Sequence, residues 1–122
     1  MDDTLQISGK DLAIALGTLL HDHRAENVIV LNLREQNTWT DFFVIATVTS
    51  STHVQGLQKH VKDFANEKEI EILRRHRKVP KDEEWSLIDL GNIVVHLMTN
   101  RARTFYELER LWSGAGVVFS AT

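Results

Sequence analysis

The stretch EEWSLIDLGNIVVHLM, from Glu83 to Met98, has the pattern of two β-strands around a tight turn. Its two apolar runs are WSLIDL and IVVHLM, and only Gly91 and Asn92 separate them. A connection this short is typical of a β-hairpin, so the two runs are expected to be neighbours in one sheet. The hairpin also contains Trp85 and an acidic residue, Asp89, before the turn. The hairpin is therefore the first candidate for a functional surface.

The remaining segments alternate between helical and strand patterns. Leucines recur at helical spacing after Ser8, and serine and threonine at 50–52 are N-cap residues before a second apolar stripe. The last predicted helix places Phe105, Leu108, Leu111 and Trp112 on one face. The patterns predict helices over about 9–23, 50–68 and 100–112, and strands over 28–33, 42–49, 70–75, 85–90 and 93–99.

This order, α-β-β-α-β-β-β-α, predicts an α/β (α+β) fold with one mixed sheet of about five strands flanked by helices. A length of 122 residues suits one domain over 1–122, with a core over about 8–113. The tail over 114–122, GAGVVFSAT, is either loosely attached or paired with another segment.

Composition narrows the classes of function. The chain has 14 basic and 17 acidic residues, so it lacks the overall positive charge of proteins that hold nucleic acid mainly through phosphates. It has no cysteine, which excludes thiol chemistry and fits a reducing compartment. The N-terminal residues do not resemble a signal or transit peptide, and no apolar run has the length of a membrane span. We expect a soluble, cytoplasmic protein that is not bound to a membrane.

Six histidines are present, but their spacing does not predict a metal site. His21 and His23 diverge by about 200° around a helix, and His53 and His60 are about two turns apart. His96 lies between apolar strand residues, which favours a core or interface role. We expect no metal and no cofactor.

Catalysis is the less favoured hypothesis. The segment VIATVTSSTHV, a strand, a hydroxylic turn and a helix, can present backbone N–H groups to phosphate. Metal-assisted phosphoryl transfer also needs gathered carboxylates, and no predicted strand contains an acid-x-acid pair. Ser51 and His53 are too close in sequence to form a nucleophile and its base. No catalytic residue is predicted.

A basic run lies just before the hairpin. RRHRKVPK has cations that could contact RNA phosphates, or it could be a solvated loop, since acidic residues follow at once and no aromatic residues are interleaved. Both interpretations stay open for Arg74, Arg75, Arg77 and Lys78.

Three segments together resemble the ribosomal silencing factor family, also called Iojap-related. They are VIVLNLREQNTWTDFFVIATVTSSTHVQGL, EEWSLIDLGNIVVHLM and FYELERLW, in this order. The resemblance covers about Leu12 to Trp112 and implies a nucleotidyltransferase-like topology without the catalytic carboxylates. It implies a factor that docks on a basic protein of the large ribosomal subunit, the fourteenth large-subunit protein, and blocks joining of the small subunit. Translation would then be repressed when nutrients are scarce.

The hairpin is the expected partner-binding surface. Trp85 would be an aromatic anchor, apolar neighbours would exclude water, and acidic side chains would face the basic partner. Asn92 stands where the family usually has aspartate, which removes one negative charge. The structural alternative is that Trp85 covers the core and Asp89 ties down the turn. The predicted surface consists of Asp41, Trp85, Leu87, Ile88, Asp89, Leu90, Asn92 and His96.

Two further expectations complete the hypothesis. The alternative function is a small nucleotide-dependent transferase of related topology, and saturable binding of Mg²⁺ and ATP by the pure protein would favour it. The short edge strand and the apolar GVVF of the tail predict a homodimer when the protein is free, because self-association would cover them.

Overall fold

The computed structural model describes residues 8–36, 40–73, 84–111 and 114–122. The prediction of an α/β fold with a mixed five-stranded sheet is confirmed. The described elements are α1 Gly9–Asp22, β1 Glu26–Asn32, β2 Phe42–Val48, α2 Ser51–Glu67, β3 Trp85–Asp89, β4 Ile93–Thr99, α3 Asn100–Tyr106, α4 Leu108–Leu111 and β5 Gly116–Ala121.

The sheet has the strand order β3-β4-β2-β1-β5. β2 and β4 run parallel in the middle, whereas β3 with β4, β1 with β2 and β1 with β5 are antiparallel pairs. Every residue of β2 is buried, as its apolar sequence FFVIATV predicts for a strand covered on both faces. β3 and β4 form the expected hairpin.

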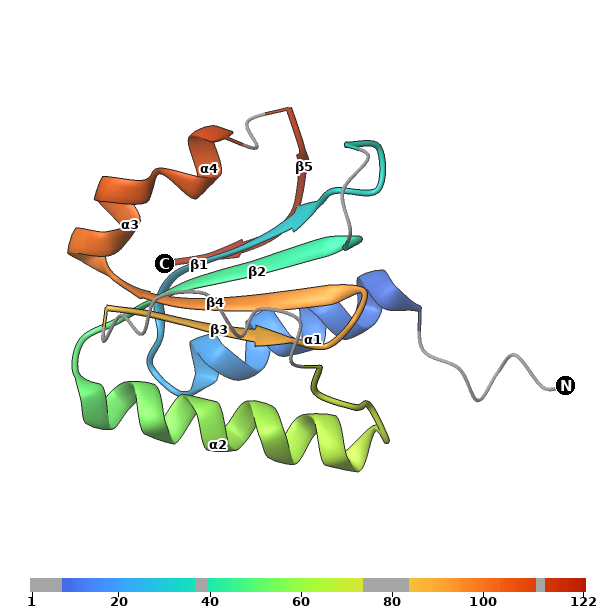
Figure 1. Cartoon of the computed structure of the whole chain (residues 1–122), viewed down its shortest axis with the longest axis horizontal. Helices are drawn as coiled ribbons and strands as arrows, with labels where there is room; N and C mark the ends of the chain where they lie inside the picture. Colours follow the sequence, from blue (N-terminus) through green and yellow to red (C-terminus); the bar gives the residue numbers. More distant parts are fainter. Residues whose placement is uncertain (1–7, 37–39, 74–83, 112–113) are drawn as a thin grey trace, which may run out of the picture.

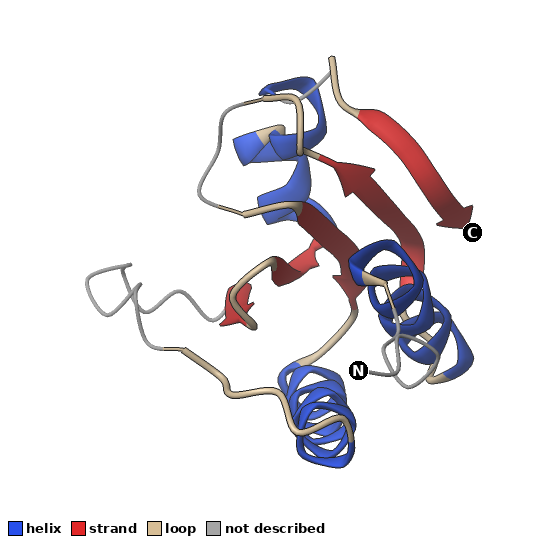
Figure 2. Ribbon diagram, turned by 90° about the vertical axis from the view of Figure 1, so that its right-hand side faces the viewer, coloured by secondary structure: helices blue, strands red, loops and turns tan. Residues whose placement is uncertain are grey.

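Helices cover the two faces of the sheet in two pairs. Figure 1 shows α1 and α2 on one face and α3 and α4 on the other, and Figure 2 shows the same layers from the side. Alternate residues of the strands point to opposite faces, so Val95 packs in the core under α1 and α2 while Val94 packs on the face of α3 and α4.

The two long helices begin where the sequence predicts. The Ser8 Oγ accepts a hydrogen bond from the N–H of Asp11 at 3.1 Å, and the Ser50 Oγ accepts one from the N–H of His53 at 3.1 Å. Each serine satisfies a backbone donor that the first helical turn leaves unpaired, which is the stabilising role of an N-cap.

The strand predicted over 70–75 is wrong over its described residues. Leu73 makes a single bridge to Asp89, and its N–H donates to the Asp89 carbonyl at 2.7 Å. Ile70 and Ile72 instead pack against the core under α1 and α2. The alternation of apolar and polar residues in this segment therefore reflects an extended chain packed on the core rather than a strand paired in the sheet.

The fifth strand comes from the tail. β5 pairs with β1 from Val28↔Ala121 to Asn32↔Gly116, with a shift in register near Val30. Phe119 is partly buried and packs against the core beside α1, where it would touch a Cβ added at Gly17 at 3.1 Å. Of the two possibilities left open for the tail, pairing is the one observed.

The last predicted helix is interrupted. Glu107 has φ 49°, a left-handed conformation that ends α3 and leads into the four-residue α4. The break changes which residues face the core, so Leu108 is buried while Phe105 is 77% exposed. The prediction that Phe105 and Leu108 lie on one helical face is therefore wrong. Trp112 lies outside the described residues.

Candidate functional site

Asp89 is a buried residue of the hairpin turn. Its side chain is 2% exposed, and its Oδ1 accepts a hydrogen bond from the N–H of Gly91 at 2.8 Å. Gly91 has φ 94°, a conformation that other residues adopt only with strain. The carboxylate thus stabilises a turn that requires glycine, which agrees with the alternative that Asp89 has a structural role in the turn. It is not the exposed charge that we predicted from the sequence.

The other predicted residues near this turn differ in exposure. Ile88 and Leu90 are 7% and 5% exposed and belong to the core under α1 and α2, so they offer little apolar surface. Asn92 is exposed, and its carbonyl accepts from the N–H groups of Asp41 and Phe42, both at 3.0 Å. Asp41 is partly exposed. We call Asp41, Asp89 and Asn92 the turn cluster.

Trp85 begins β3 at the end away from this turn. Its indole Nε1 donates to the Nδ1 of His96 at 3.1 Å, and the indole packs on the face covered by α3 and α4. His96 is 2% exposed, and its ring meets Phe43 edge-on with centroids 4.4 Å apart. Because Nδ1 accepts this bond, the imidazole is the neutral tautomer with its proton on Nε2. His96 is therefore a buried support for the indole rather than a surface residue.

Two aromatic side chains of α3 extend outward from Trp85. The Tyr106 and Trp85 ring centroids are 4.6 Å apart, and those of Phe105 and Tyr106 are 5.0 Å apart at 87°. Phe105 is 77% and Tyr106 39% exposed. We call Trp85, Phe105 and Tyr106 the aromatic patch. Contiguous exposed apolar surface of this kind often marks a site of protein interaction.

The structure divides the predicted surface into two parts. Trp85 and Asp89 lie at opposite ends of β3, about 13 Å apart along the strand. Leu87, which pairs with His96 and is partly buried, lies on the same face as Trp85. The residues around Trp85 and the turn cluster are therefore separate regions, and only the first presents large aromatic side chains.

Other predicted features fall outside these two regions. Arg74, Arg75, Arg77 and Lys78 lie outside the described residues, so their proposed contact with RNA stays a prediction. Among the described residues, no group of three or more histidines and acidic residues is arranged to hold a metal ion. In the same part of the chain, no helix has the length and apolarity needed to cross a membrane.

A family model and the sequences of known proteins match this chain and carry the same family name. The family model described as "Ribosomal silencing factor during starvation" matches residues 6–121. The "Ribosomal silencing factor RsfS" of Treponema pallidum is 37% identical over 106 residues, which is 87% of this chain and 94% of that protein. The chain belongs to the ribosomal silencing factor family.

Two further matches extend the comparison. The Mus musculus protein named "Mitochondrial assembly of ribosomal large subunit protein 1" is 29% identical over 99 residues, 80% of this chain and 43% of its own length. A crystal structure of a protein from Chromobacterium violaceum has a TM-score of 0.77 and 24% identity and covers 95% of both chains. That structure supports the fold of this chain. The finer likeness to nucleotidyltransferase topology stays a prediction.

For this member of the family, the sequence-based site omitted Phe105 and Tyr106. Helical periodicity placed Phe105 on the same face as Leu108, because the break at Glu107 has no glycine to reveal it. One signal was available: adjacent residues of a helix point about 100° apart, so Phe105 and Tyr106 cannot both lie at the centre of a buried face. That signal does not say which of the two side chains is exposed.

Proposed function

We propose that this protein binds the large ribosomal subunit and prevents the small subunit from joining it, so that translation is repressed under nutrient limitation. The observation that carries the proposal is the aromatic patch, whose Phe105 is 77% exposed. The family description, which names silencing during starvation, supports the proposed activity. The name of the mouse relative, which refers to the large ribosomal subunit, supports the proposed partner.

The aromatic patch has the composition of an interface anchor. Tryptophan and tyrosine are enriched among residues that dominate binding energy, since they bury a large area with few rotatable bonds. The hydrogen bond from Trp85 to buried His96 fixes the indole before a partner arrives. A surface that is already ordered loses less conformational entropy on binding.

The partner that we propose is the basic fourteenth protein of the large subunit. One acidic residue, Glu107, directly follows Tyr106 of the aromatic patch; its side chain is 52% exposed and lies 3.5 Å from that of Arg110. The chain also has a net charge of -3. Complementary charge would mainly speed the encounter and set the orientation. Glu107 thus takes the role first assigned to Asp89, and Asp41 and Asn92 remain a proposed second contact.

We propose a passive block without catalysis, and this makes a testable prediction. Adding the protein to separated subunits is expected to lower the yield of joined ribosomes in proportion to the large subunits bound. Adding it to ribosomes that are already joined should change little, because the docking face is then covered. Sucrose-gradient sedimentation measures both quantities. Efficient splitting of joined ribosomes at near-stoichiometric protein would contradict a passive block.

A further inference from the structure

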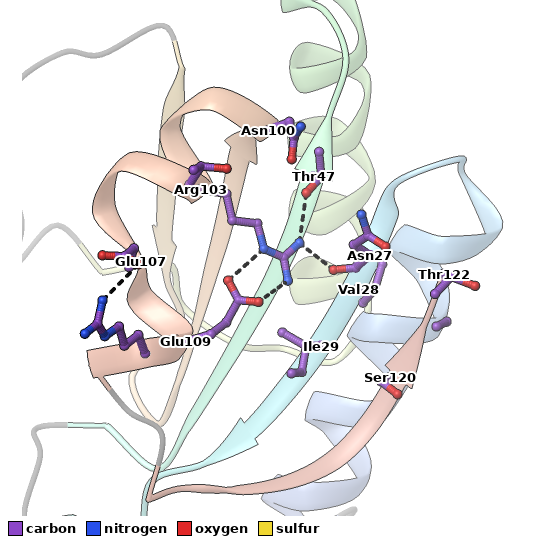
Figure 3. Close-up of a pocket in the computed structure, with 13 residues that line it drawn as sticks. Asn27, Val28, Ile29, Thr47, Asn100, Arg103, Glu107, Glu109, Ser120 and Thr122 are labelled. Carbon is purple, nitrogen blue, oxygen red and sulfur yellow. Dashed lines mark hydrogen bonds and ion pairs between the residues drawn. The ribbon is translucent and has the colours of Figure 1, made fainter.

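An open pocket of about 530 Å³ lies between β1, β2, β5 and the two short helices α3 and α4. Figure 3 shows Arg103 of α3 reaching across it, with Glu109, Thr47 and Asn27 around its guanidinium group. The Arg103 side chain is only 10% exposed. A buried arginine needs partners for its charge and its donors, so these contacts decide what the pocket can do.

The guanidinium group of Arg103 is engaged within the protein. Nε and Nη2 donate to the two carboxylate oxygens of Glu109 at 2.9 and 3.0 Å, a bidentate pair. Nη1 donates to the Thr47 Oγ1 at 2.9 Å and to the carbonyl oxygen of Asn27. Glu109 balances the charge, and four donated bonds point at protein atoms. The pocket is therefore better suited to holding elements together than to binding an anion.

The contacts of Arg103 join segments that are distant in sequence. Asn27 lies in the irregular start of β1, with φ 48°, and Thr47 is a buried residue near the end of β2. Glu109 belongs to α4, which follows the left-handed Glu107. One side chain therefore fixes α3 to two strands and fixes α4 to α3 across the break between them.

The same helix carries two members of the aromatic patch. Tyr106 is three residues after Arg103, about one turn of the helix, so the two side chains leave α3 at neighbouring positions. Any tilt or rotation of α3 on the sheet would alter the 4.6 Å contact of Tyr106 with Trp85, because Trp85 belongs to β3 and would not move with the helix.

We propose that Arg103 is a positioning residue for the aromatic patch: its four hydrogen bonds set the orientation of α3 that keeps Tyr106 against Trp85. The consequence for ribosome binding rests on the proposed function. The consequence for the geometry of the aromatic patch does not, since it concerns the free protein.

Fluorine NMR of protein labelled with 5-fluorotryptophan tests the geometry directly. Trp85→Phe identifies the Trp85 resonance among those of the three tryptophans, because that resonance disappears. Tyr106→Leu then gives the chemical shift of the Trp85 resonance when the tyrosine ring is absent. Arg103→Met is expected to move the resonance at least half-way to that position at temperatures where the variant is folded. Arg103→Lys keeps the charge but lacks the planar fork, so an intermediate shift is expected. A role in stability alone would lower the melting temperature and leave the resonance in place.

Arg110→Met is the matched control. Arg110 lies on α4, next to Glu109, but its side chain is 80% exposed and its pair with Glu107 is 3.5 Å long, so no shift is expected. The affinity of Arg103→Met for the large subunit should fall roughly three- to tenfold, which corresponds to the free energy of about one aromatic pair. An unmoved Trp85 resonance in folded Arg103→Met and Arg103→Lys would overturn the positioning role. A different outcome would separate the two proposals: the Trp85 resonance moves in Arg103→Met, but Arg103→Met and Trp85→Ala both bind the large subunit with parental affinity. That result would support the positioning role of Arg103 and refute docking through the aromatic patch.

Discussion

Replacing Trp85 with alanine is expected to weaken binding to the large subunit by about thirtyfold or more, equivalent to roughly 2 kcal/mol for loss of an interface anchor. The same change should lower the free energy of unfolding by about 2–3 kcal/mol, less than for a fully buried tryptophan. Two lost contacts account for this cost: His96 Nδ1 no longer accepts a hydrogen bond from the indole, and Tyr106 loses a neighbouring ring. Subunit co-sedimentation and thermal melting measure the two effects separately.

Trp85→Phe is the informative companion to this variant. It keeps an aromatic ring beside Tyr106 but removes the donor to His96, so about 1–3 kcal/mol of stability should be lost. Its binding should be closer to that of the parent than the binding of Trp85→Ala. A Trp85→Ala protein that melts and binds like the parent would contradict the assignment of Trp85 both to the fold and to the interface.

Deleting the seven C-terminal residues, from Gly116 onward, is expected to lower the free energy of unfolding by about 3–5 kcal/mol. The deletion removes the partly buried Val118 and Phe119 from the core and leaves β1 without its β5 neighbour. For a domain of this size, such a loss is a large part of the total stability. Chemical denaturation followed by circular dichroism measures it.

Val117→Ala is the matched control for the deletion. Val117 belongs to the same strand but is 55% exposed, so its truncation should change stability by less than about 0.5 kcal/mol. If the deletion variant unfolded at the same denaturant concentration as the full chain, β5 would not be an integral strand of the sheet.

Local sequence signals predicted the central part of the fold. Ser8 and Ser50 are N-caps in the structure as in the sequence, since capping depends only on residues within one turn. The strand predicted over 42–49 is confirmed as β2, whose continuous apolar sequence FFVIATV suits burial on both faces. The hairpin of β3 and β4 was identified from its short connection for the same local reason.

Features that depend on distant partners were missed or left open. β5 is an edge strand whose pairing with β1 depends on residues about 90 positions earlier, and GVVF alone does not specify that partner. Ile70 and Ile72 have the alternation of a strand but pack as an extended segment. The contacts of Arg103 with Asn27 and Thr47 span 76 and 56 positions, so no local pattern indicates them.

The candidate site was predicted only in part because residue type does not determine exposure. Asp89 was assigned to the surface as a charged residue, but its bond to the Gly91 N–H accounts for a place in a buried turn. The role of Trp85 as an aromatic anchor stays a prediction, and the structure adds the buried partner that orients its indole. Phe105 and Tyr106 emerged only once the break at Glu107 was known.

The most direct test of docking through the aromatic patch is the large-subunit affinity of Phe105→Ala compared with that of Val117→Ala. Phe105 and Val117 are 77% and 55% exposed, so neither change should disturb the fold, which thermal melting verifies. Phe105 belongs to the aromatic patch, whereas Val117 lies on β5. We predict at least about a fivefold loss of affinity for Phe105→Ala, equivalent to roughly 1 kcal/mol, and parental affinity for Val117→Ala. Parental affinity of folded Phe105→Ala would contradict the proposed docking surface.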